Sequence, residues 1–138
     1  MQYTLADCQQ LNLFYKKNRN KARAKPEDFM YAAINEEDQI CAVLRLLPYD
    51  DFLLLRSVLT AKEFRGQGIA ASLIQNAMKE QNALIYTLPT PLAVSLYQRL
   101  GFQALNKEQI PAQLLASYRR FRQSNTGPEA MAIDSRLG

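Results

Sequence analysis

Apolar runs separated by short turns fill the first half of the chain. Three runs, at residues 29–35, 39–47 and 52–60, are rich in Ile, Leu, Val and aromatic residues, and only three or four residues separate each from the next. Connections this short predict antiparallel neighbours, so the three runs should form a β-meander. Residues 2–5, Gln-Tyr-Thr-Leu, could form a short first strand.

Helical spacing of apolar residues flanks this meander. Before it, Asp7 can cap a helix whose expected inward positions are Cys8, Leu11, Leu13 and Phe14 or Tyr15. After it, residues 68–81 carry apolar side chains at helical spacing, which predicts an amphipathic helix. A short apolar run at residues 83–87 follows. Strand, glycine turn, helix and strand form a βαβ unit, whose two strands are parallel.

A second helix follows the run at residues 83–87, and three further elements come after it. Thr90 and Pro91 can begin that helix and Gly101 can end it. Its expected inward positions are Leu92, Leu96, Tyr97 and Leu100. A strand should follow directly, then a helix over residues 110–122 and a closing strand over residues 130–133.

The composition fits one globular domain. The chain has 138 residues, of which 48% are hydrophobic and 22% charged, and this is ordinary for a single domain. With the elements above, we expect an α/β (α+β) domain over residues 1–138: a mixed, mostly antiparallel sheet of six or seven strands flanked by about four helices. No apolar run approaches the roughly 18 residues of a membrane span. Polar residues stand where a signal peptide needs its apolar core, so we expect a cytoplasmic protein.

Scarce residue types narrow the chemistry. The chain has no histidine, which removes the commonest general base and metal ligand and excludes Ser-His-Asp and Cys-His catalysis within one chain. Its two cysteines, Cys8 and Cys41, have no metal-like spacing and make no disulfide framework. We therefore expect neither a metal site nor a covalent enzyme intermediate.

Two glycines stand between the meander and the helix that follows it. Gly66 and Gly68 let the backbone turn tightly and let a ligand come close. The first N–H groups of the helix lack partners and carry partial positive charge, to which Arg65 adds a full charge, so the junction suits a phosphate. The segment also fits G-x-G-x-x-A, but no acid ends the run at residues 83–87 and an antiparallel meander precedes it. Both features argue against a dinucleotide fold.

Two motifs resemble the landmarks of one enzyme family. Residues 65–70, Arg-Gly-Gln-Gly-Ile-Ala, resemble R/Q-x-x-G-x-G/A, the acetyl-CoA pyrophosphate signature of the GNAT (Gcn5-related) N-acetyltransferases. Residues 96–102, Leu-Tyr-Gln-Arg-Leu-Gly-Phe, resemble the family's tyrosine helix ending in Gly-Phe. The predicted order of elements matches as well, and the resemblance covers roughly residues 3–134.

The resemblance implies an acyl-CoA N-acyltransferase-like fold and acetyl transfer from acetyl-CoA, a co-substrate, to a primary amine without a metal. A backbone N–H near Leu59 would stabilise the oxyanion. Tyr97 would protonate the departing thiolate, which a phenol with a pKa of about 10 can do at neutral pH; on spacing alone it could instead be a core residue. The implied cofactor-binding residues are Val58, Leu59, Thr60, Arg65, Gly66, Gln67, Gly68, Ile69, Ala70 and Ala71.

The general base is not evident from the sequence. Many family members place a glutamate in the fourth strand, near Leu54 here, but the only charged residue in the run at 52–60 is Arg56. Asp50 or Asp51 from the preceding turn, a water chain or the solvent could take the role. Arg56 could be a surface residue or a contact for an acidic acceptor.

The family's frequent asparagine after the fifth strand is also missing. Thr87, Leu88 and Thr90 occupy that region, and only a hydroxyl from Thr87 or Thr90 could replace its contact with the cofactor.

The sequence does not identify the acceptor. Six cations among residues 16–25 are either a solvated surface or a hint of an acidic acceptor. Two rival interpretations stay open. One is a CoA-binding regulatory module without turnover. The other is a nucleic-acid-binding domain that uses residues 16–25 with Arg119, Arg120 and Arg122, although a net charge of +4 does not by itself indicate such a partner. We expect no membrane partner, and the sequence leaves open whether the protein forms a homodimer.

Overall fold

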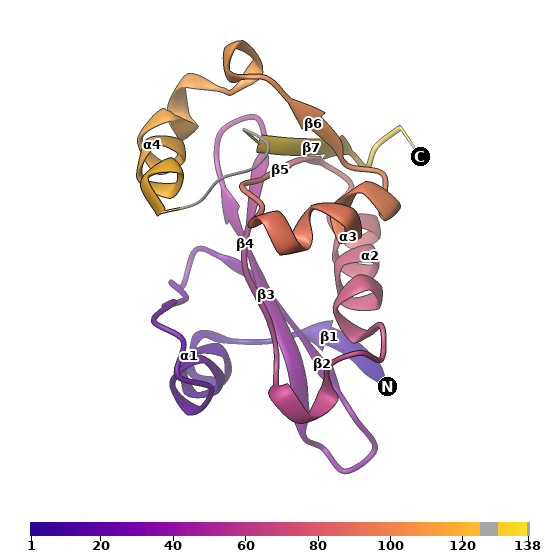
Figure 1. Ribbon diagram of the computed structural model, residues 1–138. Helices are drawn as coiled ribbons and strands as arrows, with labels where there is room; N and C mark the ends of the chain where they lie inside the picture. Colours follow the sequence, from indigo (N-terminus) through magenta and orange to yellow (C-terminus); the bar gives the residue numbers. More distant parts are fainter. Residues whose placement is uncertain (125–129, 138) are drawn as a thin grey trace.

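One seven-stranded sheet organises the molecule (Figure 1). The computed structural model describes residues 1–124 and 130–137. The sheet has the order β1-β2-β3-β4-β5-β7-β6. Its strands are β1 Gln2–Leu5, β2 Phe29–Ile34, β3 Ile40–Pro48, β4 Leu53–Thr60, β5 Leu84–Thr87, β6 Gln103–Leu105 and β7 Ala130–Asp134.

The pairing of the strands agrees with the hydrophobic pattern. Strands β1 to β4 form an antiparallel meander, as the short turns between the apolar runs predict. β5 runs parallel to β4 because helix α2 carries the chain back between them. β7 then pairs with β5 and β6, antiparallel to both. The predicted mixed, mostly antiparallel fold is confirmed.

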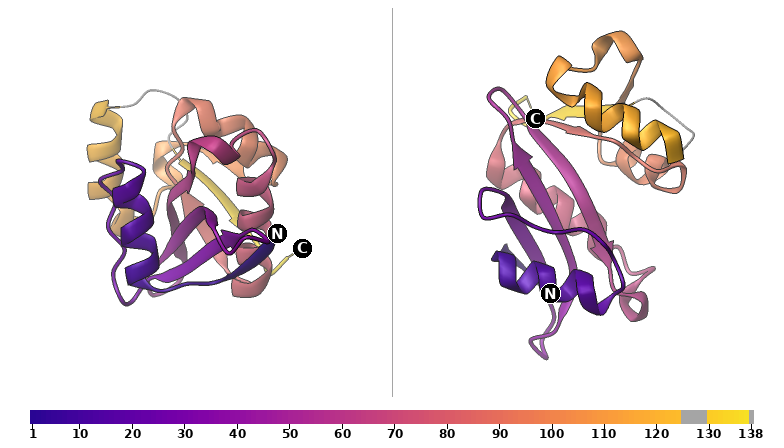
Figure 2. Two further views of the ribbon diagram at one scale, coloured as in Figure 1. Left: turned by 90° about the horizontal axis from the view of Figure 1, so that it is seen from below. Right: turned by 90° about the vertical axis from the view of Figure 1, so that its left-hand side faces the viewer.

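Helices cover both faces of the sheet. Helices α1 (Cys8–Lys17) and α4 (Leu115–Ser124) lie on one face, and α2 (Ile69–Gln81) and α3 (Val94–Arg99) on the other (Figure 2). Alternation along the strands produces the two cores, because successive side chains point to opposite faces. Leu44 and Leu55 pack in the cluster of α2, whereas Val43 packs in that of α1 and Leu54 in that of α4.

The N-terminus of α1 has the cap that the sequence predicts. The Asp7 carboxylate accepts a hydrogen bond from the Gln10 N–H at 2.9 Å, and the Gln10 side chain accepts one from the Asp7 N–H at 3.0 Å. This reciprocal capping box satisfies two N–H groups that the helix itself leaves unpaired.

Replacing Asp7 by alanine should lower the free energy of unfolding by about 1 kcal/mol, because alanine has no carboxylate to accept the hydrogen bond from the Gln10 N–H. Denaturant unfolding measures the change. Glu27→Ala, which removes the same charge from an exposed loop position, should cost less than about 0.5 kcal/mol. Equal losses in the two variants would mean that the cap does not stabilise α1.

Two predicted inward positions are wrong. Leu13 is 62% exposed and Leu92 is 96% exposed. Leu13 lies between the buried positions Leu11 and Tyr15, and a residue two places away on a helix points to the other side. Leu92 falls in a separate 3-10 turn, Pro91–Ala93, before α3 begins. A 3-10 turn has three residues per turn, so the α-helical spacing does not hold there.

The caps and the later helix also differ in detail from the sequence pattern. The Thr90 side chain makes no capping hydrogen bond. The helix expected from residue 110 begins as a 3-10 turn, Ala112–Leu114, and continues as α4. In the described ranges, no helix is both long and apolar enough to cross a membrane.

Candidate active site

The glycine junction after β4 forms an open cradle of backbone N–H groups. Gly66 and Gly68 have φ angles of 81° and 75°, which residues other than glycine rarely adopt. A Cβ at either glycine would meet no atom within 4 Å, so the space above the loop is open. The N–H groups of residues 66–71 find no acceptor among the described residues. These are the donors that a helix start offers to an anion.

Cations flank this cradle. The Arg65 Nε donates a hydrogen bond to the Thr60 carbonyl at 3.1 Å, which ties the side chain to the end of β4. Arg99, in the last turn of α3, lines the same hollow of about 180 Å³. Arg99 was not among the predicted site residues. The available signal was its position two residues after Tyr97, in the second motif.

β4 and β5 part where the cradle begins. Only Leu53–Leu55 of β4 pair with β5, which ends at Thr87. From residue 56 to Thr60, the edge of β4 that would face β5 therefore has no strand beside it. A second hollow of about 430 Å³ follows this edge. It is lined by Val58, Leu59, Thr60, Arg65, Ala70, Thr90, Leu92, Ala93, Leu96 and Tyr97.

A third hollow continues from the second toward the point where the strands separate. It has a volume of about 250 Å³ and is lined by Leu55, Arg56, Ser57, Val58, Thr87, Leu88, Pro89, Thr90, Ala93 and Tyr97. We call these three the glycine-loop, middle and inner hollows. Each shares lining residues with the next, so they form one trough. The trough brings together every predicted cofactor-binding residue except Gln67, which is exposed on the loop.

A bulge shapes the wall of the trough. Ser57 and Val58 of β4 together stand opposite Leu44 of β3, and Ser57 has a φ of 56°. The Tyr15 hydroxyl donates to the Ser57 carbonyl at 2.7 Å, which fixes the bulge from the α1 side. This bulge was not predicted, because nothing in the local sequence distinguishes it from regular strand.

Tyr97 lies at the junction of the middle and inner hollows. Its side chain is only 6% exposed, and its ring packs edge-on against Phe102 with a centroid distance of 5.2 Å. Burial raises the pKa of the Tyr97 phenol, and the nearby Thr87 hydroxyl offsets part of that rise. Thr87 itself donates to the Leu55 carbonyl at 3.2 Å. A buried phenol facing a trough can hold a proton and deliver it there.

Comparison with known proteins identifies the family. The family described as acetyltransferase (GNAT) domain matches residues 26–104, more than half of the chain. The chain belongs to the GNAT family of acetyltransferases. It is therefore an acyltransferase of the N-acetyltransferase type. The search of curated proteins returns no match.

Solved GNAT structures share the fold at low sequence identity. The ribosomal-protein-S18-alanine N-acetyltransferase of Escherichia coli superposes with a TM-score of 0.70 at 11% identity, over 99% of this chain and 95% of that one. The E. coli GNAT protein YhbS, solved with CoA, gives 0.60 at 17% identity, over 75% and 68%. N-acetylglutamate synthase of Neisseria gonorrhoeae, solved with CoA and N-acetyl-glutamate, gives 0.74 at 10% identity, over 96% and 35%. At these identities the likeness concerns the fold alone.

The described lining of the trough contains cations but no acid. Arg56, Arg65 and Arg99 line it, whereas no Asp or Glu of residues 1–124 or 130–137 does. The structure places Asp50 and Asp51 in the turn between β3 and β4, outside the lining of all three hollows. Within the described residues there is also no group of three or more side chains suited to a metal.

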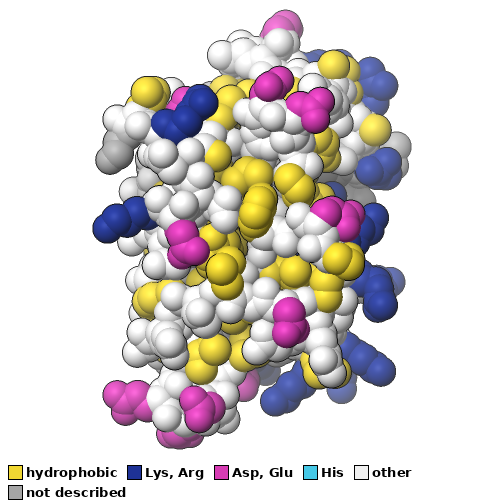
Figure 3. All heavy atoms as spheres, turned by 180° about the vertical axis from the view of Figure 1, so that it is seen from behind, with side chains coloured by type: hydrophobic (Ala, Val, Ile, Leu, Met, Phe, Trp, Pro, Cys, Tyr) yellow, Lys and Arg dark blue, Asp and Glu magenta, His cyan; other side chains and the backbone are white. Residues whose placement is uncertain are grey.

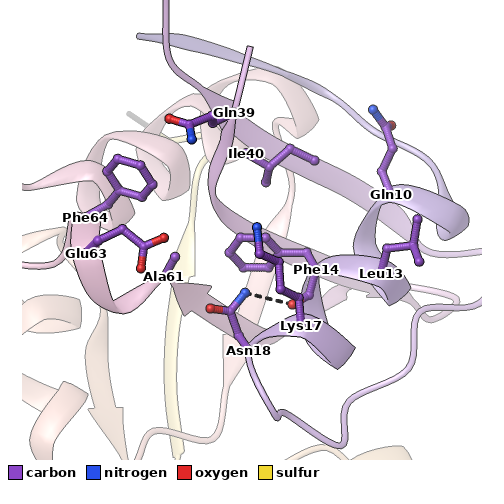
Figure 4. A pocket seen from close by; sticks show the side chains of 10 residues that line it. All are labelled: Gln10, Leu13, Phe14, Lys17, Asn18, Gln39, Ile40, Ala61, Glu63 and Phe64. Carbon is purple, nitrogen blue, oxygen red and sulfur yellow. Dashed lines mark hydrogen bonds between the residues drawn. The ribbon is translucent and has the colours of Figure 1, made fainter. Parts of the chain in front are cut away.

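A separate cavity lies on the opposite side of Phe64 from the glycine-loop hollow. It measures about 310 Å³ and is enclosed by α1, the start of β3 and the turn after β4 (Figure 4). Lys17 and Glu63 are the only charged residues among its described lining, and none of the predicted site residues lines it. We assign the active site to the trough, since the trough joins the N–H cradle, the free edge of β4 and Tyr97.

Proposed function

We propose that this GNAT protein transfers the acetyl group of acetyl-CoA to a primary amine, with residues 1–138 acting as one catalytic domain. The trough carries this proposal. It leads from an N–H cradle flanked by Arg65 and Arg99, along an unpaired strand edge, to a buried phenol. This order of chemical groups suits a ligand that has phosphates at one end, amides in the middle and a thioester at the other.

Each part of the trough would have its own task. The N–H groups of residues 66–71, with Arg65, would hold the pyrophosphate. Backbone groups of Val58, Leu59 and Thr60 would pair with the pantetheine amides as an added strand does. When bound, acetyl-CoA supplies an acetyl group activated as a thioester. The Ile69–Ala71 turn would close the wall of the cradle beside Gly68.

The chemical step needs a neutral amine and a proton for the leaving group. The amine attacks the carbonyl carbon directly, and a backbone N–H near Leu59 stabilises the negative charge on the carbonyl oxygen. Tyr97 donates its proton to the sulfur as the carbon–sulfur bond breaks. Because no acid among the described residues lines the trough, the ammonium form of the acceptor gives up its proton to the solvent before the attack. The nitrogen releases a second proton to the solvent as the amide forms, and the solvent returns a proton to Tyr97.

Steady-state release of free CoA tests this function across a panel of primary amines. Release that depends on both acetyl-CoA and an amine supports acetyl transfer. Tight binding of CoA without release above background, for every amine, would instead favour a CoA-binding regulatory module. The acid-free trough is the observation that motivates this second candidate.

Removing either of the two cations beside the cradle should weaken CoA binding, and the effect should be larger at low salt than at high salt. We expect Arg65→Gln and Arg99→Gln each to raise the dissociation constant for CoA about tenfold at low salt, because each removes a charge-assisted contact with phosphate. The loss should shrink as ionic strength rises. Calorimetric titration measures both effects. Arg23→Gln removes the same charge from an exposed loop outside the trough, so an equal loss there would argue against a phosphate site.

A further inference from the structure

Arg56 brings a positive charge into the inner hollow, and no acid of residues 1–124 or 130–137 lines the hollow beside it. It is the only charged residue among the described residues that line this hollow. Its guanidinium is partly buried and forms no hydrogen bond or ion pair with any side chain of the described residues. Burial lowers the pKa of Arg56 and the nearby Arg45 lowers it further, while Tyr49 offsets part of this and Arg120 adds a smaller decrease. A charge held in this way is costly until an anion meets it.

The neighbouring arginine shows how this protein satisfies a buried cation elsewhere. Arg45 stands directly opposite Arg56 on β3, a placement that like charges disfavour. Its Nη1 lies 3.1 Å from the Asp28 carboxylate, and its Nε donates to the Ser57 hydroxyl at 3.3 Å. Asp28 is nearly fully buried and is committed to Arg45. Among the described residues Arg56 has no such acid, so this part of the fold leaves it available to a ligand.

The location of Arg56 separates it from the CoA-facing side of the trough. Leu55 and Tyr97 belong to the core of α2 and α3, on one face of the sheet. Arg56 follows Leu55 and therefore points to the other face, as its partner Arg45 does toward Asp28. Leu55, Arg56 and Tyr97 all line the inner hollow. The hollow therefore passes between β4 and β5 from one face of the sheet to the other.

We propose that Arg56 binds a carboxylate of the acceptor, so that the substrate is an amine that carries a carboxylate within reach of this guanidinium. The proposal rests on the proposed function, because it assigns the acceptor of that same site. A guanidinium can grip a carboxylate with two parallel hydrogen bonds. With the thioester near Tyr97 and the carboxylate on Arg56, the amine lies between them in the gap between β4 and β5.

The surface outside the inner hollow favours the same ligand. Lys and Arg side chains gather along the edge formed by α1 and α4, whereas acidic side chains collect at the β2–β3 end (Figure 3). The exposed cations on these elements and the loop after α1 are Lys16, Lys17, Arg19, Lys21, Arg23, Lys25, Arg119 and Arg120. A field of one sign steers oppositely charged ligands toward the site. The Arg122 side chain lies outside the described part of the chain.

A length series of amino acids tests the proposal. The acceptors are glycine, β-alanine, 4-aminobutyrate and 5-aminovalerate, each compared with its own amide, which keeps the amine and shape but lacks the charge. We expect at least one acid to be acetylated with a kcat/KM about tenfold or more above its amide, mainly through KM. Arg56→Gln should remove this preference, and Arg23→Gln should keep it. Peptides that begin Ala-Asp and Ala-Asn test whether the carboxylate belongs to a peptide instead.

The outcomes separate this proposal from the function on which it rests. Turnover of acids and amides at equal rates, or a preference that survives Arg56→Gln, would overturn the role of Arg56 and leave acetyl transfer intact. If no amine is turned over, ligand-observed NMR of the CoA-loaded protein decides. Binding of an amino acid that Arg56→Gln abolishes would support the carboxylate site, and equal binding to both proteins would overturn it. Arg56→Lys, which keeps the charge, should retain part of the preference if Arg56→Gln proves unstable.

Discussion

Replacing Gly68 by glutamate should abolish CoA binding and leave the protein folded. At Gly68 a Cβ meets no neighbouring atom, so the new side chain extends into the open glycine-loop hollow. There its carboxylate takes the place of a phosphate and repels any that approaches, at a cost of several kcal/mol. We expect the dissociation constant for CoA to rise at least about 100-fold. Calorimetric titration measures the change, and unchanged affinity would refute the assignment of the phosphate site.

The control must separate charge from backbone strain. The φ of 75° at Gly68 makes any side chain there unfavourable by roughly 1–2 kcal/mol. Gly68→Ala carries the same strain without a charge. Both variants should therefore lose similar stability in thermal unfolding, while only Gly68→Glu loses most of its affinity for CoA. Equal loss of affinity in the two would show that strain, and not the carboxylate, disturbs the loop.

The order of the elements could be read from the sequence because each depends on local pattern. Short turns dictate the antiparallel meander, and the amphipathic stretch after Gly68 dictates the crossover to β5. The cradle was predictable for the same reason. Gly66 and Gly68 are needed for their positive φ angles, and a helix start follows them directly. These features require no knowledge of distant contacts.

The width and lining of the trough could not be predicted, because they arise from tertiary packing. β5 ends at Thr87 while β4 continues to Thr60, so the gap depends on two segments that are far apart in the chain. The bulge at Ser57 depends on the Tyr15 hydroxyl of α1. Arg99 reaches the cradle only because α3 packs beside α2.

The role of Arg56 could not be predicted either, because it depends on charged residues of the neighbouring strand. Within its strand it is an isolated cation, and the sequence leaves its role open. Only the cross-strand position of Arg45, already paired with Asp28, reveals that Arg56 lacks an acid within the described residues. The cofactor half of this site therefore follows from local motifs, whereas the acceptor half follows from pairing between strands.

Removing the Tyr97 hydroxyl should lower turnover far more than it lowers affinity for CoA. Phenylalanine keeps the ring and its edge-on contact with Phe102, so the packing of α3 is preserved. The variant loses the proton that would go to the leaving sulfur. A general acid typically contributes about 10²–10⁴-fold to the rate, and we expect kcat to fall within that range. The dissociation constant for CoA should change less than about threefold, since the proposed contacts that hold CoA lie in the cradle and along the β4 edge, and one neutral hydroxyl adds little to binding.

The pH profile distinguishes proton donation from a merely structural role of Tyr97. Burial raises its pKa above the ordinary 10.0, so the phenol keeps its proton at every pH below that value. In the unmodified protein, kcat at saturating acceptor should therefore stay level up to about pH 10 and fall only above it, as the phenol ionises. Tyr97→Phe should lack this alkaline fall. Tyr86→Phe, which removes a hydroxyl from a tyrosine of β5 outside the trough, should retain both the rate and the profile. Unchanged turnover in Tyr97→Phe would show that another group, or water, protonates the thiolate.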